Sequence, residues 1–130
     1  MGISKIMKNI QRKEYLEKIA RFIDKPVIKI ITGMRRAGKS FLMRQVIDEL
    51  KTKGINPKSI LYINMDLVEF DHLQNYKDLN HHIKKYFKAN QQTKYLFIDE
   101  VQNIDQWEKT INSIFTETGT DIYLTGSNAG

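Results

Sequence analysis

The sequence predicts an α/β fold, a three-layer α/β/α sandwich in which helices cover both faces of a mostly parallel sheet. Two observations predict it. Strand-like and helix-like segments alternate along the 130 residues, and the expected strands are short apolar runs of the kind buried on both faces. No repeat or low-complexity linker interrupts this pattern. Residues 1–130 are therefore expected to form one domain, with an N-terminal helix in 1–25 and the α/β core in 26–130.

The first elements follow from apolar spacing and from proline and glycine. Residues 4–24 are expected to form a helix, because apolar residues recur there at near-helical spacing. Pro26 ends this segment, and the β-branched run Val27–Ile31 is expected to form the first strand. A loop and a helix at Lys39–Lys53 follow, and Gly54 stands where a helix-terminating glycine belongs.

Three further strands and two helices are expected in the rest of the chain. The strands are Ser59–Asn64, Lys94–Asp99 and Asp121–Thr125, each an apolar run bounded by polar residues. The helices are Tyr76–Ala89 and Asp105–Thr118, and Asp105 with Glu108 three residues later is typical of a capping box.

Composition and charge exclude some classes of protein and leave others open. The absence of cysteine excludes disulfides and thiolate metal sites, and is consistent with a cytoplasmic protein. No stretch has the roughly 20 apolar residues of a membrane span. Residues 1–60 hold 15 Lys and Arg against 5 Asp and Glu, and residues 61–130 hold 6 against 10. A basic half indicates either a nucleic-acid partner or solvated lysines on helix faces.

The clearest motif is Gly-Met-Arg-Arg-Ala-Gly-Lys-Ser at Gly33–Ser40, which matches the phosphate-binding P-loop pattern. It lies between an expected buried strand and an amphipathic helix, which is the context that the motif requires. Glycines bring backbone N–H groups close to phosphate oxygens, the lysine reaches the β and γ phosphates, and the serine hydroxyl is a ligand of Mg²⁺. With the residue that follows, the candidate nucleotide-binding residues are Gly33, Met34, Arg35, Arg36, Ala37, Gly38, Lys39, Ser40 and Phe41.

Two acidic residues end the third expected strand. Asp99 and Glu100 follow four apolar residues, at the edge where ligands bind in parallel α/β sheets. Phosphoryl transfer needs a carboxylate near the Mg²⁺ ion and a base that activates water. Asp99 and Ser40 are therefore the candidate metal ligands, Asp99 acting through water, and Glu100 is the candidate base.

Polar residues after the fourth strand could contact the γ-phosphate or the attacking water. Asn128 is the favoured residue, and Ser127 is the alternative. With Glu100 and Lys39, Asn128 completes the expected catalytic set. Gln102 follows Glu100 closely and is a candidate for relaying the state of the nucleotide.

Taken together, Gly33–Ser40, Leu96–Glu100 and Thr125–Asn128 resemble the AAA+ superfamily of P-loop ATPases. The segments around them, including Leu61–Asn64 and Trp107 after the acidic pair, are similar to the N-terminal AAA domain of prokaryotic archaeal-type ATPases. The resemblance implies a sheet of order 2-3-4-1, Walker A roles for Lys39 and Ser40, Walker B roles for Asp99 and Glu100, and a sensor role for Asn128.

The resemblance also implies parts that follow the sensor strand in the family. A fifth strand, a helical lid, an arginine finger and a long C-terminal region are expected beyond Gly130, so the sequence is interpreted as a truncated domain. The first strand would then be an exposed sheet edge, through which a homo-oligomer could form.

Three functions remain open at this point. The first is an ATPase that uses ATP and Mg²⁺ as part of a larger motor or switch. The second is a nucleotide-binding module with little or no turnover, and the third is a basic nucleic-acid-binding protein. The sequence names neither a biological substrate nor a pathway.

Overall fold

The computed structural model describes residues 12–32, 36–87 and 94–126. Four parallel strands form its sheet in the order β1-β4-β3-β2. The strands are β1 (Lys29–Ile31), β2 (Ile60–Asn64), β3 (Tyr95–Asp99) and β4 (Asp121–Thr125). The predicted α/β fold with a parallel sheet is confirmed, and the order is the expected 2-3-4-1 read from the opposite edge.

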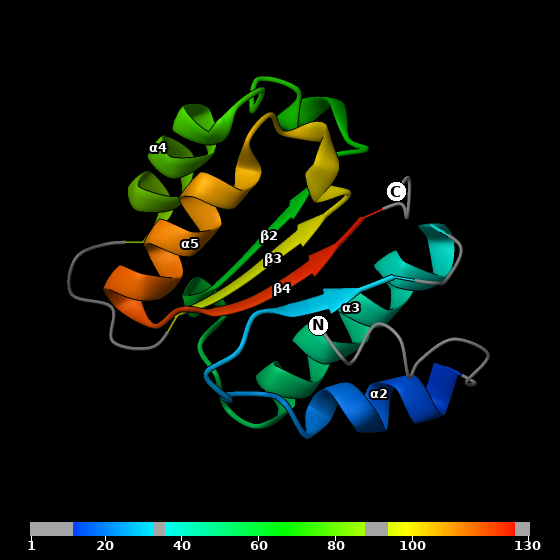
Figure 1. Cartoon of the computed structure of the whole chain (residues 1–130). Helices are drawn as coiled ribbons and strands as arrows, with labels where there is room; N and C mark the ends of the chain where they lie inside the picture. Colours follow the sequence, from blue (N-terminus) through cyan, green and yellow to red (C-terminus); the bar gives the residue numbers. More distant parts are fainter. Residues whose placement is uncertain (1–11, 33–35, 88–93, 127–130) are drawn as a thin grey trace.

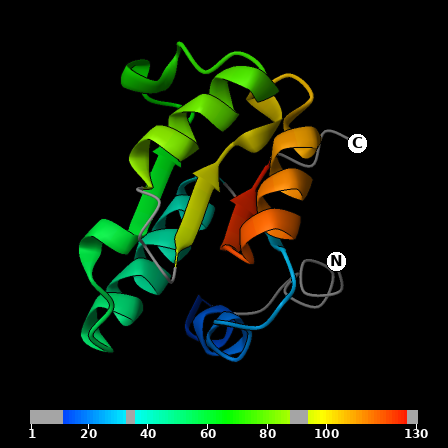
Figure 2. The ribbon, with the colours of Figure 1, turned by 90° about the vertical axis from the view of Figure 1, so that its left-hand side faces the viewer.

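Helices cover both faces of this sheet (Figures 1 and 2). α2 (Arg12–Ala20) and α3 (Arg36–Thr52) pack against one face, and α4 (Tyr76–Tyr86) and α5 (Trp107–Thr118) pack against the other. Each face has its own apolar core. Ile31 and Phe97 belong to the core beneath α3, whereas Leu96 and Ile98 belong to the core beneath α4 and α5. Alternate residues of β3 thus serve both cores, which explains why its sequence is continuously apolar.

Several element boundaries differ from the expected ones. Only Lys29–Ile31 of the first apolar run is strand. The segment 65–75 contains a 3₁₀ turn at Val68–Phe70, and further 3₁₀ turns lie at Pro57–Ser59 and Val101–Asn103. Gly54 has a φ of 95° just after α3, which confirms the expected glycine stop.

The expected cap of the last helix is wrong. α5 begins at Trp107, and Gln106 precedes it in the left-handed region with no side-chain hydrogen bond to the helix. Asp105 instead donates its backbone N–H to Gln74 at 2.9 Å and forms a bridge with Asn75. Asn75 is itself the N-cap of α4, where its side chain accepts from two backbone N–H groups. The bridge therefore ties together the starts of the two helices on this face.

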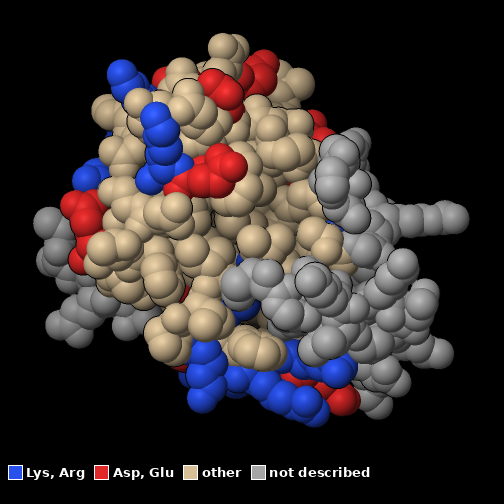
Figure 3. Space-filling model, in the orientation of Figure 1, with Lys and Arg blue, Asp and Glu red and all other residues tan. Residues whose placement is uncertain are grey.

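Basic side chains gather at the lower end of the face in Figure 3, at the level of α2 and the turn after it. Acidic side chains lie among them there, and Lys and Arg are mixed with Asp and Glu on the rest of this face as well. The nucleic-acid partner stays a prediction. None of the described helices is long and apolar enough to cross a membrane.

The candidate residues come together because of strand direction. In the parallel register, Asn64 of β2 lies beside Asp99 of β3, and Ile31 of β1 lies beside Thr125 of β4. The strands therefore end at one edge of the sheet, near the start of α3 (Figure 1). This is the edge at which open α/β sheets bind ligands.

Candidate functional site

The P-loop motif runs into the first turn of α3. The helix begins at Arg36 rather than at the expected Lys39, so Gly38 and Lys39 lie in its first turn and Ser40 follows directly, and all three are buried. Backbone N–H groups in a first turn have no partner within the helix and carry partial positive charge, so they favour an anion. The described residues leave out Gly33, Met34 and Arg35, and leave out the side chains of Arg36 and Ala37.

Lys39 connects this turn to the ends of two strands. Its Nζ atom donates to the carbonyl of Gly126 at 2.6 Å and lies 3.8 Å from Oε2 of Glu100. Lys39 is only 3% exposed. Its charge is therefore held at the strand ends, next to the first turn of α3. An ammonium has three donors, so Lys39 can contact Gly126 and an added anion together.

Asp99 is fully buried and accepts hydrogen bonds from the hydroxyls of three described residues. Ser40 and Tyr62 both donate to Oδ2, the latter at 3.1 Å, and Thr125 donates to Oδ1. A carboxylate has about four lone-pair sites. The hydroxyls leave capacity on Oδ1 for a further donor such as a metal-bound water, and they fix the orientation of the carboxylate.

These oxygen atoms fit a magnesium ion. Mg²⁺ in proteins takes hard oxygen ligands and commonly uses one or two carboxylates, with substrate phosphates and water completing its shell. The Ser40 hydroxyl and the Asp99 carboxylate are such oxygens, and they are in direct contact. Within the described ranges there is no group of three or more His, Cys, Asp or Glu that could hold a metal by itself. The Ser40 and Asp99 oxygens could therefore hold a metal ion only together with ligands from outside the described residues, such as phosphate oxygens and water.

Glu100 is also fully buried, and its backbone is unusual. It adopts the left-handed conformation with φ 60° and ψ 51°, which non-glycine residues seldom do. The Gln102 side chain donates from Nε2 to Oε1 of Glu100 at 2.7 Å, and Lys39 approaches Oε2. The turn after β3 therefore directs Glu100 back toward Lys39 rather than into solvent.

Gly126 lies close to this group, and a side chain there would disturb it. A Cβ atom on Gly126 would stand 2.9 Å from Oε1 of Gln102. The glycine thus allows β4 to pass Gln102 closely while its carbonyl accepts from Lys39. The hypothesis that Gln102 relays nucleotide state gains a contact with Glu100 but stays a prediction.

The structure adds two residues that the sequence analysis missed, Tyr62 and Thr125. Tyr62 was treated only as part of a strand, and Thr125 was passed over in favour of Ser127 and Asn128, which lie outside the described residues. Burial and the neighbouring Asp99 carboxylate raise the pKa of Tyr62 to about 12, and the Arg44 charge lowers it in part. Tyr62 is therefore protonated at neutral pH and acts as a donor.

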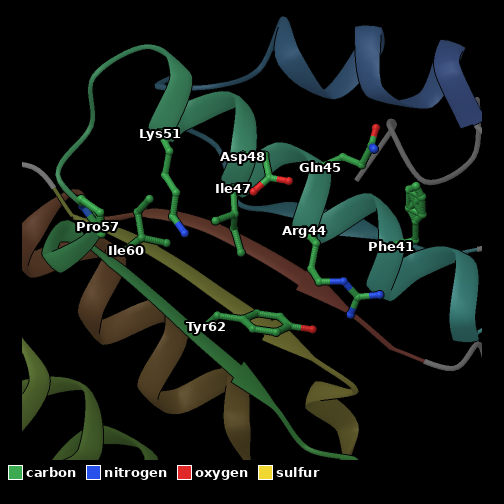
Figure 4. A pocket seen from close by; sticks show the side chains of 9 residues that line it. All are labelled: Phe41, Arg44, Gln45, Ile47, Asp48, Lys51, Pro57, Ile60 and Tyr62. Carbon is green, nitrogen blue, oxygen red and sulfur yellow. The ribbon is translucent and has the colours of Figure 1, made fainter.

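Phe41, the last candidate nucleotide-binding residue, is partly buried on α3. It lies one residue beyond Ser40 and lines a pocket between α3 and β2 (Figure 4). Phe41 thus follows Ser40 on the helix and is part of the lining of this pocket.

Comparison with known proteins gives a family and two relatives. A family model described as "AAA domain" matches residues 25–130. An uncharacterized protein of Haemophilus influenzae is 38% identical over 120 residues, which are 92% of this chain and 30% of that protein. The uncharacterized protein MJ1544 of Methanocaldococcus jannaschii is 31% identical over 105 residues, which are 78% of this chain and 21% of that protein. The chain thus spans less than a third of these curated relatives, and no solved structure matches it.

Proposed function

The chain belongs to the AAA domain family, and from that premise we propose that it binds ATP with Mg²⁺ and hydrolyses the bond between the β and γ phosphates. The hydrogen bond between Ser40 and Asp99 carries this proposal. It joins residues 59 positions apart in the chain, one from the P-loop motif and one from the end of β3. A buried hydroxyl and carboxylate in contact beside a buried lysine are the groups needed to hold a metal-bound triphosphate.

The phosphate chain is proposed to lie over the first turn of α3. There the free backbone N–H groups and the Lys39 ammonium would contact the β and γ oxygens. The motif residues Gly33–Gly38 would supply the remaining N–H contacts. When bound, Mg²⁺ offsets negative charge on the transferred phosphoryl group. Ser40 would bind it directly, and Asp99 would hold one of its water ligands.

Glu100 is proposed as the base. A water molecule attacks the γ-phosphorus, its proton passes to the Glu100 carboxylate, and the bond to the bridging oxygen breaks to release ADP and phosphate. The contact with Gln102 orients one carboxylate oxygen. Lys39, at 3.8 Å from the other oxygen, stabilises charge that develops on the phosphoryl group.

Other parts of the proposal rest on the family resemblance. Asn128 is proposed as a sensor of the γ-phosphate. Residues 1–130 are proposed to act as one nucleotide-binding domain of a longer cytoplasmic ATPase similar to the archaeal-type ATPases.

Titration calorimetry of Mg·ATP tests the proposal on the wild type, Lys39→Ala and the control Lys51→Ala. Lys51 lies on the same helix but is exposed. We expect wild type and Lys51→Ala to bind Mg·ATP with similar affinity. Lys39→Ala should bind it at least tenfold more weakly, because, of these two lysines, Lys39 is the one that lies at the strand ends. A folded wild type that binds no Mg·ATP, or equal binding by Lys39→Ala, would refute the phosphate site.

A further inference from the structure

A pocket of about 600 Å³ lies between α3 and the edge strand β2, next to the proposed metal site. Its walls include Phe41, Arg44 and Lys51 on α3, and Tyr62 on β2 (Figure 4). The Arg44 guanidinium and the Tyr62 hydroxyl point toward one another across this pocket (Figure 4). The outer side of Tyr62 therefore faces a cation.

The inner side of Tyr62 faces Asp99. The Tyr62 hydroxyl donates to Oδ2 of Asp99 at 3.1 Å, the same oxygen that Ser40 contacts. In the sheet register Tyr62 lies beside Phe97, two residues before Asp99 on β3, so its long side chain reaches along the strand to the carboxylate. One side chain thus contacts both the pocket and the proposed magnesium ligand.

The charge of Arg44 should strengthen the hydrogen bond from the Tyr62 hydroxyl to Asp99. A positive charge beside a phenol oxygen draws electron density from its O–H group and makes it a stronger donor. Arg44 lies on that side, and its charge acts on Tyr62. Removing Arg44 should therefore weaken the Tyr62 bond to Asp99, whereas removing the phenol hydroxyl deletes that bond completely.

We propose that Tyr62 is a positioning residue for Asp99, and that Arg44 supports it from the pocket, so that both residues set the magnesium requirement of nucleotide binding. This inference rests on the proposed function and deepens it. Partners that orient metal ligands commonly change metal affinity or activity about 10–100-fold when they are removed. Since Ser40 and Thr125 would still hold Asp99, the low end of that range is expected for Tyr62.

The test measures ATP affinity by calorimetry with EDTA and over a range of Mg²⁺ concentrations. Tyr62→Phe removes only the hydroxyl. We expect the Mg²⁺ concentration that gives half of the Mg²⁺-dependent increase in ATP affinity to be about tenfold higher for this variant than for the wild type. Its affinity in EDTA should be unchanged. Arg44→Gln should shift the requirement in the same direction by a smaller factor.

Two variants with matched substitutions, one of a tyrosine and one of a cation, serve as controls. Tyr86→Phe also removes a phenol hydroxyl that is hydrogen-bonded to β2, since Tyr86 of α4 donates to the carbonyl of Ile60 at 2.9 Å. Lys51→Gln removes the other cation of the pocket. Both should keep the wild-type Mg²⁺ requirement, and thermal melting confirms that each variant is folded.

The possible results separate this inference from the proposed function. Wild-type Mg²⁺ dependence in Tyr62→Phe, or equal shifts in Tyr62→Phe and Tyr86→Phe, would overturn the inference and leave the proposed function intact. A folded wild type that binds no ATP in Mg²⁺ would overturn both.

Discussion

The hydroxyl of Thr125 accepts a hydrogen bond of 3.0 Å from the backbone N–H of Glu100 and donates to Asp99 with its own proton. One buried hydroxyl at the end of β4 therefore contacts both Asp99, the last residue of β3, and Glu100, which follows it. The left-handed backbone of Glu100 costs on the order of 1–3 kcal/mol and persists only where its surroundings hold it. Thr125 is one of the groups that hold it.

Replacing Thr125 with alanine should lower both stability and hydrolysis. The variant leaves the buried N–H of Glu100 and an oxygen of Asp99 without this partner, which costs about 1–3 kcal/mol of unfolding free energy. Thr125→Ser keeps the hydroxyl and should recover most of the loss. Urea denaturation and phosphate release measure the two effects.

A second threonine provides the control for Thr125→Ala. Thr118 donates to the carbonyl of Ile114 at 2.7 Å on α5, away from the strand ends that carry the site. Thr118→Ala should leave phosphate release unchanged. If Thr125→Ala and Thr118→Ala reduced hydrolysis equally, the role assigned to Thr125 would be wrong.

Replacing Glu100 with glutamine should separate hydrolysis from binding. The amide keeps the size of the side chain but cannot accept the proton of water, and a general base contributes about 10²–10⁴-fold. We expect hydrolysis to fall by that factor while the affinity for Mg·ATP stays within about threefold, because general-base catalysis acts on the chemical step. Phosphate release and calorimetry on the same preparation check this, with the exposed Glu117→Gln as control. Undiminished hydrolysis would exclude Glu100 as the base.

A buried ion pair holds the opposite end of the sheet. Lys29 on β1 is fully buried and forms a salt bridge with Asp121 on β4, whose other oxygen accepts from Tyr123 at 2.7 Å. Lys29 also donates to the carbonyl of Lys25 at 2.9 Å, in the turn before β1. The pair thus attaches β1 and the preceding turn to β4.

Breaking this pair should destabilise the protein without altering the site. Removal of one partner from a buried pair leaves an uncompensated charge and typically costs about 3–5 kcal/mol. Lys29→Met should therefore lower the unfolding free energy by about that amount. The double variant Lys29→Met with Asp121→Leu should lower it by less than Lys29→Met alone. Urea denaturation measures the loss, with the exposed Lys53→Met as control. A loss below about 1 kcal/mol for Lys29→Met would contradict the assignment.

The sequence was informative where a local pattern has one physical cause. Apolar runs predicted all four strands, because a strand buried on both faces must be apolar throughout. The residues Ser40, Asp99 and Glu100 could be chosen because each adjoins such a run or a glycine motif. Their meeting at one edge of the sheet then follows from parallel strand direction.

The missed features depend on contacts that no local pattern reveals. Tyr62 and Thr125 reach Asp99 across 37 and 26 residues, and their sequence neighbourhood is that of ordinary strands. The cap expected at Asp105 is absent because α5 begins at Trp107, which puts Gln106 rather than Asp105 at the N-cap position. The sequence signal for a cap was present, but the helix starts one residue later than that signal requires, and the backbone N–H of Asp105 pairs with Gln74.

A partly buried histidine should make stability depend on pH. Burial, followed by the nearby charges of His72, Lys85 and His81, lowers the pKa of His82 below its ordinary value of 6.5. The His82 ring packs on α4 against Phe70, with 6.0 Å between ring centroids, and lies 5.9 Å from the ring of His72. Protonation would place a positive charge in this partly desolvated cluster.

The sign of the effect follows from proton binding. Between the lowered pKa in the folded state and the ordinary value in the unfolded state, the unfolded chain binds more protons, so stability rises with pH. Stability from this group is therefore complete above about pH 6.5 and is lost as the pH falls through that window. His82→Gln should remove this part of the pH dependence. His81→Gln should keep most of it, because His81 contributes least to the lowered pKa of His82. Denaturation at several pH values and NMR titration of the His82 ring measure it. A His82 ring that titrates at or above its ordinary value would contradict the prediction, because the folded state would then bind protons at least as readily as the unfolded chain.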